Sequence, residues 1–255
     1  MTLASWYEDH GRHDLPWRLT RDRWAVLVSE VMLHQTQVPR VAAVYGAFLA
    51  QFPTPTVMAD AGPAATIAAW GRLGYPRRAR RLYDTALVVR DHGWPDDLTE
   101  LPGIGRYTAA AIGAQVDDVD VPAIEVNIRR VAERVTGARL TDRAAEAATV
   151  RIGRPLRGRD RLLALMDVGA LLCRPRDPRC GDCPLRRRCA TRGPLPDETR
   201  HRQPPFAGSF RQRRGEVMAR LRAGSAAARE LDAEALASLV DDGLAVVVRG
   251  RARLP

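Results

Sequence analysis

The feature that most constrains this chain is the distribution of its cysteines. All four, Cys173, Cys180, Cys183 and Cys189, lie in one arginine-rich stretch, CRPRDPRCGDCPLRRRC, within a sequence of 255 residues. The start MTLASWYEDHGRHD lacks the apolar run of a signal peptide, and no apolar stretch reaches the length of a membrane span. We therefore expect a cytoplasmic protein, in which disulfides are rare and clustered cysteines bind metal.

The spacing of the thiols, C-x6-C-x2-C-x5-C, suits one site with four thiolate ligands. Zinc accepts four thiolates, usually arranged as two short knuckles. An iron–sulfur cluster also takes four thiolates, from wider and less even spacings. The gaps of six and five residues favour the cluster, but spacing alone leaves both metals open. The arginines between the cysteines suggest a metal-shaped loop that contacts phosphate groups.

The charge of the chain indicates a polyanionic partner. Its formal net charge is +10, and all 40 basic side chains are arginine, because the sequence contains no lysine. The planar guanidinium group binds phosphates in a bidentate manner. A basic surface can serve solvation alone, but an excess of this size favours nucleic acid or an acidic membrane face.

Helical periodicity dominates the chain, so we expect an all-α protein. RWAVLVSEVMLHQT, which starts at Arg23, has apolar residues at helical spacing, and no strand-like alternation appears before residue 240. Similar helical patterns occur at 64–75, 78–91, 127–137 and 160–173. Residues 194–205 are rich in proline and polar side chains, which predicts a linker. Beyond them, helices followed by a hairpin after Asp242-Gly243 predict a small winged-helix-like module.

LPGIGRYTAAAIGA, residues 101–114, predicts a hairpin between two helices. Pro102 and Gly103 interrupt the preceding segment, Gly105 closes a tight turn, and a helix-forming run begins at Tyr107. Backbone N–H groups exposed at such a helix start can bind a DNA phosphate. An ordinary glycine turn between packed helices is the simpler alternative.

Together these motifs resemble the MutY-type adenine DNA glycosylases of the helix–hairpin–helix (HhH-GPD) superfamily. The resemblance runs from Trp6 to about Cys189 and is carried by LPWR at 15–18, SEVMLHQTQV at 29–38, WGRLGYPRRA at 70–79, LPGIGRYTAAAI at 101–112, IEVNIRRV at 124–131, MDVGALLC at 166–173 and the four cysteines. It implies a two-lobed helical fold and a four-iron, four-sulfur (4Fe-4S) cluster on those cysteines. The expected domains are a cluster lobe of 1–22 with 120–193, a helix–hairpin–helix lobe of 23–119, a linker of 194–205 and a C-terminal module of 206–255.

The resemblance also implies a reaction, the hydrolysis of the N-glycosidic bond of an adenine opposite guanine or 8-oxoguanine in duplex DNA. Glu30 matches the catalytic acid, and Tyr107 matches a tyrosine beside the catalytic pair. Glu125 stands where the family has an aspartate, so its carboxylate is one methylene further from the backbone. Without a lysine, no side-chain amine can attack the sugar, which predicts a monofunctional enzyme of base excision repair.

The predicted contacts to double-stranded DNA come from the motifs and from the arginine-rich loop. Gln35 is expected to insert into the base stack, and His34 replaces a glutamine of the family. The other expected contacts are Leu101, Gly103, Gly105, Arg106, Asn127, Arg174, Arg176, Arg186 and Arg187.

Two other functions fit the sequence. One is a related mismatch glycosylase that removes thymine or uracil opposite guanine. The other is a DNA-lesion-binding protein whose catalytic slot has drifted at Glu125 and His34. About fifty residues follow the linker, too few for the domain that reads 8-oxoguanine in larger relatives. We expect a monomer associated with the nucleoid through DNA.

Overall fold

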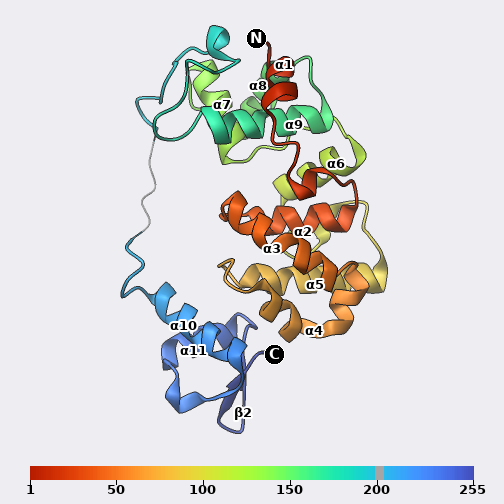
Figure 1. Ribbon diagram of the computed structural model, residues 1–255, viewed down its shortest axis with the longest axis vertical. Helices are drawn as coiled ribbons and strands as arrows, with labels where there is room; N and C mark the ends of the chain where they lie inside the picture. Colours follow the sequence, from red (N-terminus) through yellow and green to blue (C-terminus); the bar gives the residue numbers. More distant parts are fainter. Residues whose placement is uncertain (199–203) are drawn as a thin grey trace. The chain divides into compact units, whose positions relative to one another are not determined.

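The computed structural model describes residues 1–198 and 204–255, and helices make up most of it (Figure 1). The predicted all-α fold with a small C-terminal extension is confirmed. The chain divides into two compact units, Met1–Glu30 with Ile104–Arg200, and Val31–Gly103 with His201–Pro255. The linker predicted at 194–205 includes residues 199–203, which lie outside the described residues. No described helix combines the length and the apolar character needed to span a membrane.

The first unit interleaves the start of the chain with its middle. Its elements are α1 (Leu3–His10), η1 (Pro16–Arg18), the first part of α2 (Arg23–Leu33), α6 (Arg106–Asp117), α7 (Val126–Thr136), α8 (Asp142–Gly153), α9 (Gly158–Asp167), the π-helical turn η3 (Val168–Leu172) and η4 (Arg186–Arg188). The core includes Trp6, Ala114, Ile128, Val131, Leu163 and Leu165. A buried ion pair between Arg18 and Asp167, at 2.7 Å, joins η1 to the end of α9.

The second unit contains the rest of α2, α3 (Val38–Gln51), α4 (Pro55–Trp70), α5 (Arg77–His92) and η2 (Leu98–Glu100). The helices α4 and α5 pack against each other. Gly62, with φ of 85°, kinks α4 directly before Pro63. The buried side chains of this part include Phe48, Met58, Ile67, Trp70 and Leu82.

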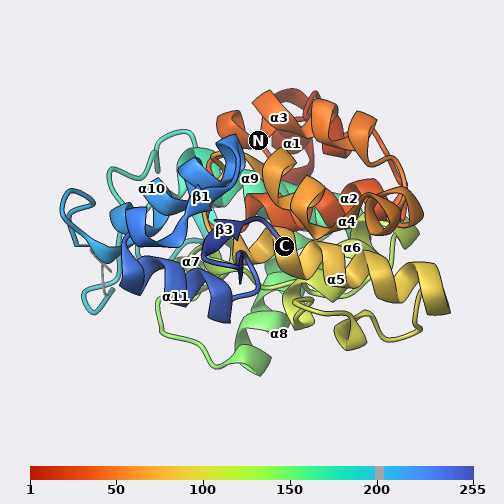
Figure 2. The same cartoon turned by 90° about the horizontal axis from the view of Figure 1, so that it is seen from below.

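The C-terminal module belongs to the second unit and has the element order of a winged helix. Its elements are α10 (Phe210–Ala223), β1 (Ala226–Ala227), η5 (Ala228–Glu230), α11 (Ala233–Asp241), β2 (Val246–Val248) and β3 (Arg251–Arg253). The strands form an antiparallel sheet in the order β1-β3-β2, with α10 and α11 beside it (Figure 2). The expectation of no strand before residue 240 is wrong for β1. Ala226 and Ala227 are too short a stretch to show the alternation of polar and apolar residues that marks a strand. They form one only because they pair with β3.

Polar contacts hold this module to α5. Asp242, at the end of α11, pairs with Arg214 of α10 at 2.5 Å and also with Arg77 of α5. The Nη1 atom of Arg80 donates to the carbonyl oxygen of Gly243 at 3.0 Å. These contacts attach the connection between α11 and β2 to the first turns of α5.

Candidate active site and cysteine loop

Glu30 is the most deeply buried carboxylate among the predicted site residues. It lies in α2 with 3% of its surface exposed, beside the fully buried Leu27 and Val28. Burial is the main reason that its pKa is raised, and the nearby Glu125 adds to the effect. Hydrogen bonds from Gln115 and Tyr107 oppose the rise in pKa. A carboxyl group with a raised pKa can hold and deliver a proton near neutral pH.

Glu125 is the N-cap of α7, and its carboxylate folds back onto the start of that helix. Its Oε1 accepts from the backbone N–H of Ile128 at 2.9 Å, and its Oε2 accepts from Nδ2 of Asn127 at 2.9 Å. Burial is the largest influence and leaves the pKa of Glu125 raised, and these hydrogen bonds oppose the rise. The helix N-terminus and two donors favour the charged form, so Glu125 is suited to remain a carboxylate beside a protonated Glu30.

Tyr107 and Gln115, both on α6, complete the acid pocket, which we define as Glu30, Tyr107, Gln115 and Glu125. Burial and the two carboxylates raise the pKa of Tyr107 well above its ordinary value, so its hydroxyl is a neutral donor to Glu30. The Nε2 atom of Gln115 donates to Oε1 of Glu30 at 2.7 Å. The structure therefore brings together the three predicted catalytic residues and adds Gln115. The available signal for Gln115 was its spacing from the buried Thr108 and Ile112 on one face of α6.

His34 and Gln35 follow the end of α2 in the second unit and differ in exposure. Gln35 is exposed and has φ of 54°, whereas His34 is half-buried. Burial and the charge of Arg78 lower the pKa of His34, so this side chain is neutral at physiological pH. A neutral, half-buried imidazole is less suited to a phosphate contact than the exposed Gln35 amide is to insertion between bases.

Arg78 and Tyr75 are two residues near this turn that sequence reasoning missed. Nη1 of Arg78 donates to the carbonyl oxygens of Val31 at 2.8 Å and Met32 at 2.9 Å, and it also reaches the oxygen of His34 at 2.5 Å. Arg78 thus caps the carboxyl end of α2. Tyr75 is 44% exposed with φ of 46°, so it presents an aromatic surface that can stack on a base.

The hairpin at 101–105 offers backbone rather than side-chain contacts. Leu101 is only 2% exposed, so its side chain packs inside the protein and its predicted contact to DNA is left to its backbone. Gly103 has φ of 78°, and an added Cβ would lie 2.7 Å from Cδ of Arg81, so glycine is required there. Gly105 is the N-cap of α6, and both Gly105 and Arg106 are exposed.

Asn127 makes hydrogen bonds inside the protein, and its predicted contact to DNA stays a prediction. Its Nδ2 donates to Glu125, and its Oδ1 accepts from Nη2 of Arg130 at 2.7 Å. The side chain therefore links the Glu125 carboxylate to α7. Sequence reasoning could find Asn127 from the motif, but the direction of its side chain depends on packing.

The cysteine loop, residues 173–189, gathers all four thiols around one cavity. Cys173, Cys180, Cys183 and Cys189 line it together with Val131, Val168, Leu172 and Leu185, and all four cysteines are free of disulfides. Cys173 follows η3, where its N–H donates to the carbonyl oxygen of Val168 at 2.7 Å. Burial raises the pKa of the Cys183 thiol to about 11. A cavity that is shared by four thiols and lined by apolar side chains and by Arg134, Arg179, Arg186 and Arg192 suits a group that all four thiols bind.

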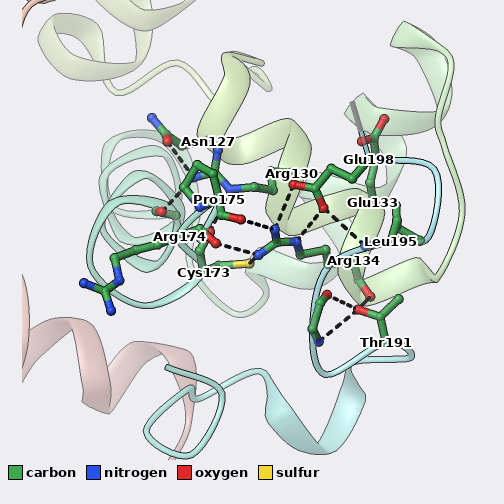
Figure 3. A network of polar contacts seen from close by, with 12 residues as sticks. Asn127, Arg130, Glu133, Arg134, Cys173, Arg174, Pro175, Thr191, Leu195 and Glu198 are labelled. Atoms are coloured by element: carbon green, nitrogen blue, oxygen red, sulfur yellow. Dashed lines mark hydrogen bonds and ion pairs between the residues drawn. The ribbon is translucent and has the colours of Figure 1, made fainter. Parts of the chain in front are cut away.

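A network around Arg134 anchors the loop (Figure 3). Arg134 is 1% exposed and donates to both carboxylate oxygens of Glu198, at 3.0 and 2.8 Å. Its Nη1 donates to the carbonyl oxygen of Arg174 at 2.8 Å and lies 3.6 Å from Sγ of Cys173. Burial raises the pKa of Cys173, and the Arg134 charge opposes that rise. The guanidinium therefore favours a thiolate at Cys173.

The four arginines of the loop that were predicted to contact DNA are all exposed to solvent. They are Arg174, Arg176, Arg186 and Arg187. Arg174 is turned toward its own loop, because its Nη2 donates to the carbonyl oxygen of Asp177 at 2.9 Å. Exposure leaves these cations accessible to phosphate groups.

The sequence matches known proteins over most of its length. Its relatives include the adenine DNA glycosylase of Mycolicibacterium smegmatis, at 42% identity over 234 residues, which covers 86% of this chain and 79% of that protein. The adenine DNA glycosylase of Mycobacterium tuberculosis is 39% identical over 282 residues, covering 99% of this chain and 92% of that protein. The human adenine DNA glycosylase is 35% identical, covering 75% of this chain and 39% of that protein.

Solved structures share the fold of this chain. A thermostable thymine-DNA glycosylase has a TM-score of 0.67 and 27% identity, covering 74% of this chain and 91% of that one. Endonuclease III in a non-covalent DNA complex has a TM-score of 0.64 at 22% identity, covering 74% and 91%, and shares the fold. Residues 28–155 also match the model of the HhH-GPD superfamily base excision DNA repair proteins. The chain thus belongs to the HhH-GPD superfamily of base excision DNA repair proteins and, within it, to the family of the adenine DNA glycosylases.

Proposed function

We propose that this chain is a monofunctional DNA glycosylase that hydrolyses the N-glycosidic bond of an adenine opposite guanine or 8-oxoguanine in duplex DNA. The observation that carries the proposal is the acid pocket, in which the buried Glu30 lies beside a second carboxylate, Glu125, whose oxygens are held by donors of α7. When the surroundings of two carboxyl groups give them different pKa values, one group can act as the acid while the other remains a carboxylate.

The chemistry follows from these roles. The target adenine leaves the base stack, because its glycosidic bond is inaccessible inside the duplex. Glu30 donates its proton to the purine, and the bonding electrons leave with the base. The positive charge that develops on the sugar faces the Glu125 carboxylate, and Tyr107 keeps Glu30 in place. Glu30, now ionised, accepts a proton from the water that adds to the sugar.

The absence of lysine supports hydrolysis without lyase activity. All 40 basic side chains are arginine, and a guanidinium does not form the Schiff base that a lysine amine forms with the sugar.

Cys173, Cys180, Cys183 and Cys189 would hold a 4Fe-4S cluster. The cavity that all four thiols share, and its apolar walls, support this assignment. When bound, the cluster supplies a cross-link between four points of the loop. The exposed Arg176, Arg186 and Arg187 are then fixed on a rigid support.

DNA binding is assigned to three sets of groups. They are the backbone N–H groups at Gly103 and Gly105 with Arg106, the amide of Gln35 beside His34, and the exposed arginines of the cysteine loop. The net charge of +10 and the DNA complexes of endonuclease III support this partner. We place the protein in the cytoplasm, on the nucleoid, as a monomer.

A single-turnover assay over mismatched duplexes tests the proposal. Base release is expected from A:G and A:8-oxoguanine duplexes and not from T:G or U:G duplexes. Release of thymine or uracil alone would favour the alternative that the structural likeness to a thymine-DNA glycosylase supports. Tight binding to duplexes without any base release would favour a lesion-binding protein.

A further inference from the structure

Gln115 is a buried amide that directly contacts the residue proposed as the acid. It lies in the last turns of α6 and is 1% exposed. Its Nε2 atom donates to Oε1 of Glu30 across 85 positions of sequence, at 2.7 Å. Buried amides require hydrogen-bond partners, and a donor within 2.7 Å of a carboxyl oxygen also constrains the rotation of that carboxyl group.

We propose that Gln115 is a positioning residue that fixes Oε1 of Glu30 as an acceptor, so that the acid proton is carried on Oε2 in a single orientation. The reason is that the amide nitrogen of Gln115 donates hydrogen bonds and accepts none. A proton on Oε1 would therefore face another proton, whereas the Tyr107 hydroxyl can also accept and is compatible with a proton on Oε2. This inference rests on the proposed role of Glu30 as the acid.

A chain of buried polar contacts holds Gln115 in place. Nη1 of Arg159 donates to the carbonyl oxygen of Gln115 at 2.6 Å, and its Nη2 donates to the carbonyl oxygen of Arg18. Arg18 in turn forms two hydrogen bonds to Asp167, at 2.7 and 2.8 Å. These contacts tie α6 to η1 and α9, so the amide approaches Glu30 from a fixed backbone.

Four residues besides the apolar walls act on the charge of Glu30. Gln115 and Tyr107 come from α6, Glu125 from the start of α7, and Arg18 from η1. Burial raises the pKa of Glu30 most strongly, and the Gln115 hydrogen bond is the largest influence that lowers it. Loss of the amide therefore raises the pKa of Glu30 further and frees the carboxyl group to rotate.

The test is the pH dependence of single-turnover adenine release with saturating enzyme, in Gln115→Leu and Gln115→Met. Both side chains fill similar space without a donor, and methionine adapts to irregular gaps. We expect the plateau rate to fall by about tenfold or more, since small misplacements of a reacting group are costly. The high-pH limb of the curve of rate against pH, where Glu30 loses its proton, should move to higher pH. DNA affinity should stay unchanged.

Thr149→Val is the matched control. Thr149 is a buried polar residue of the same unit, and its hydroxyl has no hydrogen-bond partner within the part of the chain described. This variant should keep both the plateau rate and the position of the high-pH limb. A folded Gln115→Leu or Gln115→Met variant with the wild-type plateau and limb would overturn the inference. A limb that moves to lower pH would also overturn it, because the amide would then stabilise the protonated acid.

Glu30→Gln separates this inference from the proposed function. If Glu30→Gln is inactive while Gln115→Leu matches wild type, only the positioning role fails. If Glu30→Gln retains the wild-type rate, the acid role fails, and the inference about Gln115 fails with it.

Discussion

The acid pocket and the cysteine loop lie in the same unit, and they differ in what surrounds their reactive atoms. In the acid pocket, Glu30 and Glu125 accept hydrogen bonds from protein donors at 2.7 to 2.9 Å. In the cysteine loop, the four thiols line one cavity whose other walls include Val131, Leu172 and Leu185. Burial in this cavity raises the pKa of Cys173 and of Cys183 and so favours neutral thiols, and the Arg134 charge opposes this effect at Cys173.

Under the proposed cluster assignment, this difference separates a site that the protein completes from a site that a bound group would complete. Buried polar atoms are stable when protein partners satisfy them, which is the case for the two carboxylates. Thiolate ligands in an apolar cavity become stable when a metal group binds them. Changes in the acid pocket should therefore affect the reaction, whereas changes in the cysteine loop should affect structure and DNA binding.

Glu30→Gln should have the largest effect on the reaction. The amide preserves the shape of the side chain but cannot deliver a proton, so we expect single-turnover adenine release to fall by about 10²- to 10⁴-fold. DNA affinity and thermal stability should stay close to wild type, because the buried group is already favoured in its neutral form. A large loss of DNA affinity instead would mean that the acid pocket is a structural site.

Cys183→Ser should have the largest effect on structure. We expect the purified wild-type protein to be coloured and to contain about four iron atoms per chain, and the variant to lose both iron and colour. DNA binding should weaken because the arginines lose their rigid support. Iron analysis and visible absorption provide the measurement. A colourless wild-type protein with stoichiometric zinc would contradict the cluster.

Substitutions of Glu125 test how far its longer side chain limits the reaction. Glu125→Ala should lose most of the activity, because no carboxylate then faces the sugar. Glu125→Asp should keep or increase the rate of adenine release, since it restores the family's residue and aspartate is a preferred N-cap. Single-turnover rates on A:G and A:8-oxoguanine duplexes measure both. A faster Glu125→Ala variant would remove this residue from the mechanism.

Glu198→Gln should destabilise the cysteine loop without changing the acid pocket. Arg134 would remain buried with a weaker partner, which we expect to cost about 1–3 kcal/mol of the free energy of unfolding. Burial alone raises the pKa of Glu198, but the Arg134 contact, together with the backbone N–H of Leu195 and the charge of Arg130, leaves the pKa below its ordinary value. The wild-type pair therefore stabilises the protein above the unfolded pKa of glutamate, and this stability is lost as pH falls through the folded pKa. Thermal unfolding at neutral and acidic pH should show a variant difference that shrinks with acidification.

Arg186→Ala and Arg187→Ala should have the smallest effects. Each is expected to weaken DNA binding a few-fold and to make the slope of log affinity against log salt shallower by about 0.9 for each phosphate that the variant no longer neutralises. The weakening should be similar for all duplex sequences, because phosphate contacts carry no base information. Arg220→Ala, an exposed arginine of α10, is the matched control. An equal change in slope for all three variants would indicate a diffuse charge effect.

Sequence reasoning was most successful where a property is local. The helix at 23–33, the hairpin glycines and the cysteine set follow from periodicity and spacing, and the family resemblance is confirmed. Glu30 could be selected because its motif is contiguous. The sequence could not predict that the side chain of Leu101 is buried or that the side chain of Asn127 binds Glu125, because side-chain direction depends on packing partners elsewhere in the chain.

The amino-acid sequence by itself determined the helical class of this protein and its family, and it predicted the two candidate carboxylates, Glu30 and Glu125. Only the tertiary structure decided which groups surround those carboxylates. Gln115 reaches Glu30 across 85 residues, and β1 exists only because Ala226 and Ala227 pair with β3. Local preferences act over a few residues, whereas the environment of a buried acid is set by which helices pack against it. That environment determines the pKa of Glu30.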